Sequence, residues 1–288
     1  MPAISHVGAP HTETQEKLSD KVFNYYNTKG YDRNQIQAEL DPKGYVHHHF
    51  GIGGLDIDIK NSSTDELTME IQRLENDQMD YITKMLNVNE TDRVLDLGCG
   101  RGGTMFKLVD TFGCSVQGIN LTEYQTQFCA KLIKDKNLDN RCKVDQGDFM
   151  NMSYERDSFD AAVSNEVSQY AYDLNEYFAN VNKVLKKYGE FVIATWCYND
   201  HKDTKEYHHF TTPISLHYAS TMHGINEYLN ALNNTGFKTT QVLNVTEMAI
   251  PYWEARTEWE LKSGVEPFFL NAHKNDDMRY YFICAKKI

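Results

Sequence analysis

The stretch VLDLGCGRGG, Val94 to Gly103, decides the fold of this 288-residue chain. It begins with a short apolar run typical of a buried strand and ends in a turn rich in glycine. Glycines at a strand-to-helix turn let the backbone approach a ligand closely, and the N-terminus of the following helix adds positive potential. The stretch therefore predicts a ligand site at the carboxyl end of a strand.

On both sides of this stretch, short apolar runs alternate with segments of helical periodicity. We expect strands at 93–97, 115–119, 142–146, 159–164 and 190–195, with helices at 102–112, 122–136 and 174–186. This alternation implies right-handed crossovers and a parallel sheet covered on both faces. The predicted fold class is α/β, with a doubly wound, mostly parallel sheet.

The chain after this region predicts a smaller set of elements. We expect a helix at 226–234, a strand at 239–245, a helix at 253–263 and a last strand at 280–286. A strand that arrives last in such a sheet often lies antiparallel at its edge, so we place 280–286 there.

The residues before the sheet predict a separate N-terminal part. A short helix is expected at 17–27, and apolar residues spaced by three, four and seven predict an amphipathic helix at 66–86. We therefore divide the chain into a tail and substrate-pocket segment, 1–65, and a core domain, 66–288, with an inserted cap at 197–225.

Composition excludes several classes of protein. The net charge is -12, so the basic footprint of a duplex nucleic-acid binder is missing. The six cysteines form no C-x-x-C pair, and no apolar run approaches the roughly 20 residues that cross a bilayer. We expect a cytoplasmic protein with no membrane or nucleic-acid partner, and homo-oligomer formation is left open.

The glycine-rich turn has one feature that narrows its ligand. Asp96 stands two residues before Gly98, which makes the pattern D-x-G-x-G instead of the dinucleotide pattern G-x-G-x-x-G. A carboxylate suits a ligand with an amino group and a sulfonium better than one with two phosphates. Here the chain resembles the class I S-adenosylmethionine-dependent methyltransferases.

This first resemblance implies a cofactor site made of three parts. A methionine end, a ribose contact and an adenine contact would come from successive strand ends. The family's usual ribose acid is replaced by an asparagine in the run GINLTEYQ, which puts that contact in doubt. The implied residues are Asp96, Gly98 and Gly100 for the methionine end, Asn120 or Gln125 for the ribose, and Asp148 with Phe149 for adenine.

The stretch YVHHHFGIGG, 45–54, allows three readings: a metal site, a phosphate loop or an aromatic wall. Alternate residues of an extended segment point in opposite directions, so only His47 and His49 could share a metal, and no third ligand accompanies them. GIGG follows no predicted strand and lacks the Lys-Ser/Thr of a nucleotide loop. We predict an aromatic wall and no protein-built metal site.

Six separated motifs carry a narrower resemblance. The chain is similar to the geranyl diphosphate C-methyltransferases, bacterial enzymes that make 2-methylgeranyl diphosphate. The resemblance spans nearly all of the chain from about Tyr25. The motifs are YVHHHFGIGG (45–54), IQRLENDQ (71–78), VLDLGCGRGGTM (94–105), SNEVSQY (164–170), LHYASTMHGINEYL (216–229) and IPYWEAR (250–256).

This resemblance implies a mechanism and a set of residues. The alkene would attack the sulfonium methyl, aromatic faces would stabilise the resulting cation, and Glu166 would remove a proton. Phe50 and Tyr218 would be the cation-stabilising aromatics, in exchanged order relative to the family pattern of Tyr then Phe. Mg²⁺ would arrive with the diphosphate. The implied substrate-binding residues are Tyr26, Asn27, His47, His49, Tyr252, Trp253 and Arg256.

Other functions stay open at this point. Isopentenyl or farnesyl diphosphate would use the same chemistry, and pocket depth would decide among them. A small-amine N-methyltransferase would also use an aromatic cage, but it would need neither Mg²⁺ nor a dedicated base. A binding module with a vestigial cofactor site would bind S-adenosylmethionine and turn over no acceptor.

Overall fold

The computed structural model describes residues 15–27, 37–202 and 204–288, and its centre is a seven-stranded sheet of order β3-β2-β1-β4-β5-β7-β6. The pairs among β1 to β5 are parallel, and β7 is antiparallel to both of its neighbours. This confirms the predicted mostly parallel, doubly wound sheet. The strands are β1 (Arg93–Leu97), β2 (Ser115–Asn120), β3 (Cys142–Gln146), β4 (Phe159–Asn165), β5 (Leu185–Tyr198), β6 (Phe237–Asn244) and β7 (Met278–Lys287).

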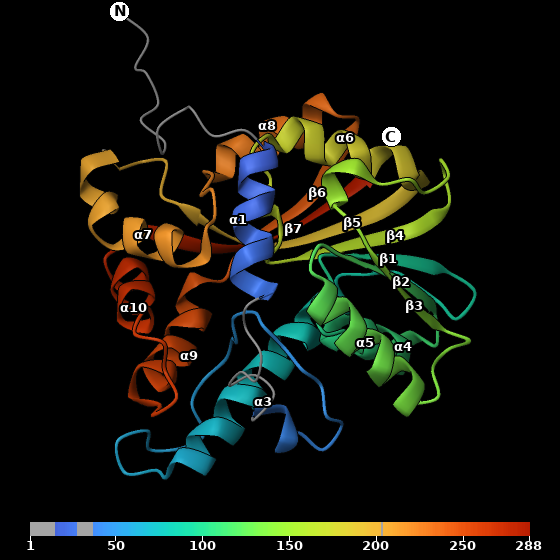
Figure 1. Ribbon diagram of the computed structural model, residues 1–288. Coiled ribbons are helices and arrows are strands. Elements are labelled where there is room, and N and C mark those ends of the chain that lie inside the picture. Colours follow the sequence, from blue (N-terminus) through green and yellow to red (C-terminus); the bar gives the residue numbers. More distant parts are fainter. Residues whose placement is uncertain (1–14, 28–36, 203) are drawn as a thin grey trace, which may run out of the picture.

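Helices cover both faces of the sheet (Figure 1). On one face lie α6 (Leu174–Val184) and α8 (Ile225–Asn234), and on the other α4 (Gly103–Phe112) and α5 (Glu123–Asp135). Because the chain leaves β1 and β4 in opposite directions along the sheet, the loops after these neighbouring strands diverge. Such a switch point is where doubly wound sheets bind ligands.

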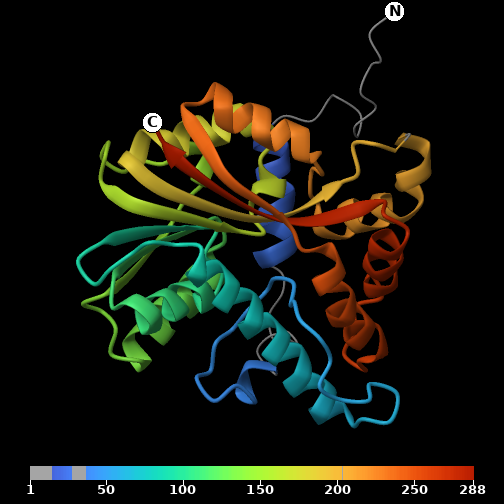
Figure 2. The same cartoon turned by 180° about the vertical axis from the view of Figure 1, so that it is seen from behind.

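The remaining helices surround the carboxyl ends of the strands. Helix α3 (Thr64–Lys84) packs on α4 and α9, α1 (Gln15–Asn27) crosses near α5, and α7 lies against α10 (Figures 1 and 2). Helix α3 starts with a complete capping box between Ser63 and Glu66. The other elements are α7 (Thr204–Tyr218), α9 (Thr246–Glu258), α10 (Glu266–Lys274) and the short 3-10 helices η1 (Phe149–Asn151) and η2 (Ser168–Tyr170).

Two hydrophobic clusters form the core, one on each face of the sheet. The first joins α3, α4, α9 and α10 to the sheet, and the second joins α1, α6 and α8 to it. All six cysteines lie within the described residues as buried free thiols. No helix in the described part of the chain is long and apolar enough to cross a membrane.

The placement of the last strand at the sheet edge was wrong. Strand β7 is antiparallel, as predicted, but it lies between β5 and β6. Its residues are buried almost without alternation, whereas most residues of β6 are exposed or half-buried, as befits an edge. The near-continuous apolar run in YYFICAK was the sequence signal for an interior strand.

Two boundaries also differ from prediction. Helix α6 ends at Val184, and β5 starts directly at Leu185 with an irregularity in its pairing to β4, so Gly189 lies inside a strand. Helix α9 begins at Thr246 and contains Pro251, whereas the predicted helix was 253–263, and α7 and α10 were not predicted at all. Packing on α3 and α10 accompanies the earlier start of α9, and local sequence does not contain these contacts.

Candidate functional site

Two adjoining cavities open at the carboxyl ends of the strands. The larger cavity, with about 930 Å³ of empty space including its opening to solvent, is lined by the loops after β1, β2, β3 and β4, by α1 and by residues 46–49. The aromatic cavity, with about 430 Å³ counted in the same way, is lined mostly by ring side chains of the 48–50 segment, α7, α9 and α10. Both cavities share Tyr26, His48, His49, Glu166 and Tyr170.

Asp96 and the glycine turn form the floor of the larger cavity. The Asp96 carboxylate is buried, and its Oδ2 atom has no hydrogen-bond partner among the described residues. Burial alone raises the pKa of this carboxyl well above its usual value. Gly100, at φ +52°, faces open space where a side chain would stand. The floor therefore leaves one carboxylate oxygen without a donor among the described residues, in a cavity that has room for one.

The end of β2 carries a small amide network. The Asn120 side chain donates to Gln125 Oε1 at 3.0 Å, and the Thr122 hydroxyl donates to the same oxygen at 3.0 Å. All three residues are buried and line the larger cavity. Thr122 is the N-cap residue of α5, but its hydroxyl donates to Gln125 and makes no cap to the backbone.

Asp148 and Phe149 lie in the same cavity, after β3. One carboxylate oxygen of Asp148 accepts from the Met150 backbone N–H at 2.8 Å and so caps η1. The other accepts from the Ser19 hydroxyl of α1 at 3.0 Å. Helix α1 thus closes this end of the cavity, and sequence reasoning missed Ser19 because nothing local marks it.

Glu166 stands where the two cavities meet. It follows β4 in a left-handed backbone conformation, φ +54°, which is unusual for a residue with a side chain and is typical of functional turns. Its Oε1 atom accepts from the Phe50 backbone N–H at 2.6 Å and from the Tyr280 hydroxyl at 2.7 Å. Burial, together with the nearby Glu75, raises the pKa of Glu166 to about 8, although these two hydrogen bonds lower it.

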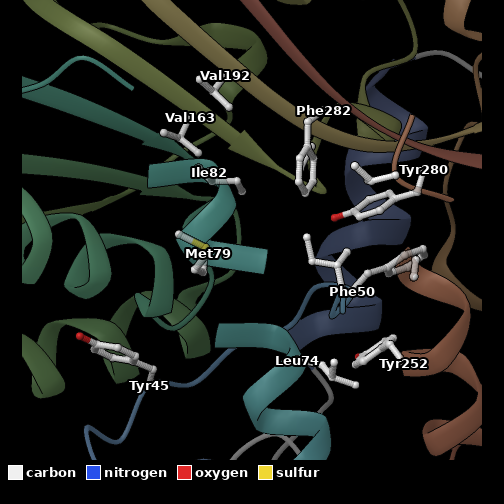
Figure 3. Packing of buried hydrophobic residues seen from close by; sticks show 14 of the residues in the cluster. Tyr45, Phe50, Leu74, Met79, Ile82, Val163, Val192, Tyr252, Tyr280 and Phe282 are labelled. Carbon is white, nitrogen blue, oxygen red and sulfur yellow. The ribbon is translucent and has the colours of Figure 1, made fainter. Parts of the chain in front are cut away.

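The Phe50 ring lies inside a group of aromatic rings that line or back the aromatic cavity (Figure 3). Its centroid is 4.6 Å from Trp253, 4.8 Å from Tyr280 and 5.1 Å from Phe269. Tyr218, at the end of α7, lines the same cavity and lies 5.9 Å from Phe269. The structure therefore brings together the two aromatics predicted from distant motifs.

The histidine triplet is divided between the cavities. His47 lines the larger cavity and not the aromatic cavity. Its Nε2 atom lies 2.9 Å from the side-chain oxygen of Asn76. His49 lines both, and its Nδ1–H donates to the Phe50 carbonyl at 2.9 Å. Burial lowers the pKa of His47 to about 4 and that of His49 well below its usual value, so both rings are neutral.

No protein-built metal site is seen in the part of the chain that the structure describes, since no three metal-ligating side chains gather there. Gly51, the first glycine of GIGG, is required by close packing. A Cβ at Gly51 would stand 2.6 Å from Leu74 of α3 and from Tyr252 of α9, and the Ile52 N–H donates to the Leu74 carbonyl. The segment is thereby held against two helices.

Arg256 lines the aromatic cavity and has two N–H groups, at Nε and Nη1, without a partner among the described residues. It is buried, and its Nη2 atom lies 3.4 Å from Glu266. The Trp253 indole N–H has no described partner either, and Tyr252 lines the same cavity. Asn27 ends α1, and its side chain lies outside the described residues.

Comparison with known proteins agrees with this geometry. A family model described as a methyltransferase domain matches residues 88–250, more than half of the chain. The chain belongs to the methyltransferase domain family. The class I methyltransferase fold and the methyltransferase enzyme class that the sequence predicted are thus confirmed.

Within the family, the resemblance noted from the six motifs is also confirmed. The geranyl diphosphate 2-C-methyltransferase of Saccharopolyspora erythraea is 29% identical over 272 residues, 93% of this chain and 94% of that protein. A geranyl diphosphate methyltransferase solved with GPP and sinefungin has a TM-score of 0.88 at 28% identity, covering 94% of this chain and 98% of that one. The geranyl diphosphate C-methyltransferase from Streptomyces coelicolor A3(2), solved with Mg²⁺, geranyl diphosphate and S-adenosyl-L-homocysteine, has a TM-score of 0.86 at 25% identity, and each chain is covered completely.

Proposed function

We propose that this methyltransferase transfers a methyl group from S-adenosylmethionine to a carbon of an isoprenyl diphosphate, with geranyl diphosphate as the first candidate and 2-methylgeranyl diphosphate as the product. The observation that carries the proposal is Glu166, a buried carboxylate between a cofactor-sized cavity and an aromatic one. An amine acceptor would need no such base. The full-length similarity to geranyl diphosphate methyltransferases supports the choice of substrate.

The larger cavity suits S-adenosylmethionine, which supplies an electrophilic methyl group when bound. Asp96 Oδ2 would accept from the amino group of the methionine end, because this buried oxygen has no hydrogen-bond partner among the described residues. Gly98 and Gly100 would lie against the same end, and Asn120 or Gln125 against the ribose. Asp148 and Phe149 would hold adenine beside α1.

The aromatic cavity suits a prenyl chain with an anionic head. Apolar rings would surround the chain, and the unsatisfied donors of Arg256 and Trp253 would bond the diphosphate. Neutral His49 presents an acceptor at Nε2, so it would need to be protonated to bond an anion. Mg²⁺ would be held chiefly by the diphosphate and water, since carboxylate clusters are missing from the described residues.

The proposed reaction balances within these groups. The alkene electron pair forms the new carbon–carbon bond to the methyl group as its bond to sulfur breaks. The resulting tertiary cation lies among the faces of Phe50 and Tyr218, and Glu166 removes a proton from the methylated carbon. The carbon–hydrogen pair then restores the double bond. A dry aromatic cavity protects the cation from water.

The division of the chain follows from this proposal. Residues 1–65 would supply the tail and one wall of the substrate pocket, since 46–50 line the cavities. Residues 66–288 would form the methyltransferase domain, with 197–225 covering the substrate, since Tyr218 lines the aromatic cavity.

A panel assay tests the proposal. The enzyme is incubated with labelled S-adenosylmethionine and isopentenyl, geranyl or farnesyl diphosphate, with Mg²⁺ or with an excess of chelator, and the products are identified by mass. We expect turnover of geranyl diphosphate that chelation abolishes, with cofactor binding by calorimetry unchanged. Transfer to sarcosine without Mg²⁺, or to none of the diphosphates, would contradict the proposal.

Replacing Phe50 by Leu is expected to lower kcat by about 10- to 30-fold, because a desolvated cation–π contact contributes about 2 kcal/mol. Leucine keeps an apolar side chain among the surrounding rings, so cofactor affinity should not change. The matched control is Phe282→Leu, in the same hydrophobic cluster but outside the lining of the aromatic cavity. Equal losses in the two variants would mean that Phe50 acts only by packing.

A further inference from the structure

The Glu166 carboxylate is bound to a chain of polar side chains that reaches away from both cavities. Its Oε1 atom accepts from the Tyr280 hydroxyl of β7 at 2.7 Å. The Tyr280 oxygen in turn accepts from Gln78 Nε2 of α3 at 2.9 Å, and the same amide nitrogen donates to Asn165 Oδ1 at 2.8 Å. Tyr280 and Gln78 are fully buried, and neither lines a cavity.

The donors in this chain have only one consistent arrangement. An ionised carboxylate can only accept, so the single proton of the Tyr280 hydroxyl must point to Glu166. The Gln78 amide then has to present its NH₂ group to the tyrosine oxygen, as it does. Gln78 therefore removes the alternative in which the Tyr280 proton turns away from the base.

Both hydrogen bonds to Glu166 fall on one oxygen. The Phe50 N–H and the Tyr280 O–H converge on Oε1, so neither bond occupies Oε2. Charge-assisted hydrogen bonds of this kind stabilise the ionised form. They would keep Glu166 able to take a proton although it is buried, and they would leave Oε2 as the atom that takes it.

We propose that Tyr280 is a positioning residue for this methyl transfer: it stabilises the ionised form of Glu166 and turns the carboxylate to present Oε2, and Gln78 acts through Tyr280 by fixing the direction of its hydroxyl. The inference rests on the proposed function of Glu166 as base. It assigns a joint role to two side chains that no single local motif contains, since Gln78 and Tyr280 are 202 residues apart in sequence.

Other charged or titratable groups face the same carboxyl. Glu75 of α3 raises the pKa of Glu166 by charge repulsion, and the indole of Trp196 from β5 lowers it. The tyrosines that interact with it electrostatically come from α1, η2, α9 and β7, and they are Tyr26, Tyr170, Tyr252 and Tyr280. Tyr280 is the side chain that donates to Glu166 Oε1, at 2.7 Å.

The test measures the titration of Glu166 directly. Infrared spectroscopy follows the carbonyl band of the protonated carboxyl as pH is varied, and the band is assigned by its loss in Glu166→Gln. Tyr280→Phe is expected to raise the pKa by about one unit or more, since it removes a hydrogen bond to a charged group. The matched control is Tyr281→Phe, whose neighbouring ring belongs to the cluster on the opposite face of the sheet and should leave the pKa unchanged.

A double-mutant cycle tests the part played by Gln78. Gln78→Leu alone should raise the pKa of Glu166 by less than Tyr280→Phe does, because the hydroxyl remains but is free to turn. In the Tyr280→Phe background, Gln78→Leu should cause no further change. An additive effect, or an unchanged pKa in Tyr280→Phe, would overturn the assignment.

Kinetics give a second readout that separates this inference from the proposed function. In Tyr280→Phe the acid limb of the kcat profile should shift upward with the infrared pKa, while KM for the diphosphate stays unchanged. A wild-type enzyme that methylates no prenyl diphosphate would refute the function, whatever the infrared titration shows. Normal turnover with an unshifted profile in Tyr280→Phe would refute only the role of Tyr280.

Discussion

The variant Glu166→Gln is expected to lose about 10²- to 10⁴-fold in kcat, the usual contribution of a positioned general base. Glutamine has the same shape, and its side-chain oxygen can still accept from the Phe50 N–H and the Tyr280 hydroxyl. The folded structure and the cofactor site should therefore be kept, and only proton removal should fail. Single-turnover kinetics with labelled S-adenosylmethionine and calorimetry of cofactor binding measure the two parts separately.

The pH dependence of the wild-type enzyme follows from the same residue. The base must be ionised, and the pKa of Glu166 is raised to about 8, so kcat/KM should rise as pH increases through that region. The exposed acid Glu176, replaced by Gln, is a control that should leave rate and profile unchanged. Retained turnover in Glu166→Gln would transfer the role of base to another group or to water.

The second large effect is expected in Asp96→Asn. This carboxylate is buried, and its Oδ2 atom has no partner among the described residues, so it would be able to pair with a cationic group of the cofactor. Truncating one partner of a buried charge pair costs roughly 2–5 kcal/mol, which corresponds to at least about 30-fold weaker binding. Calorimetry with S-adenosylmethionine or S-adenosylhomocysteine measures the loss.

The same substitution should stabilise the protein without cofactor. Burial raises the pKa of Asp96 in the folded chain. The free energy of unfolding therefore decreases as pH rises above the unfolded pKa of about 3.9, because the ionised carboxylate is disfavoured in the folded state. At neutral pH the neutral amide avoids this cost, and Tm without cofactor should rise. The control is Asp145→Asn, because Asp145 lines neither cavity. Unchanged cofactor affinity in Asp96→Asn would refute the proposed methionine contact.

Much of the fold was predictable because it depends on local patterns. The strands 93–97 and 142–146 match β1 and β3 to the residue, since short apolar runs between turn residues have few alternatives. The order of β7 in the sheet was not predictable in this way. Strand order depends on which buried faces meet, and periodicity within one segment does not contain that information.

The candidate site divides along the same line. The sequence pattern by itself pointed to Asp96 and the glycine turn, and the resemblance of six short motifs to the geranyl diphosphate C-methyltransferases pointed to Glu166, Phe50 and Tyr218. Only the tertiary structure brought Tyr280 and Gln78 to Glu166, closed the larger cavity with Ser19, and separated His47 from the aromatic cavity. The reason is physical: motif chemistry is set by neighbours along the chain, whereas the partners that direct a proton or satisfy a buried carboxylate are chosen by packing between elements far apart in sequence.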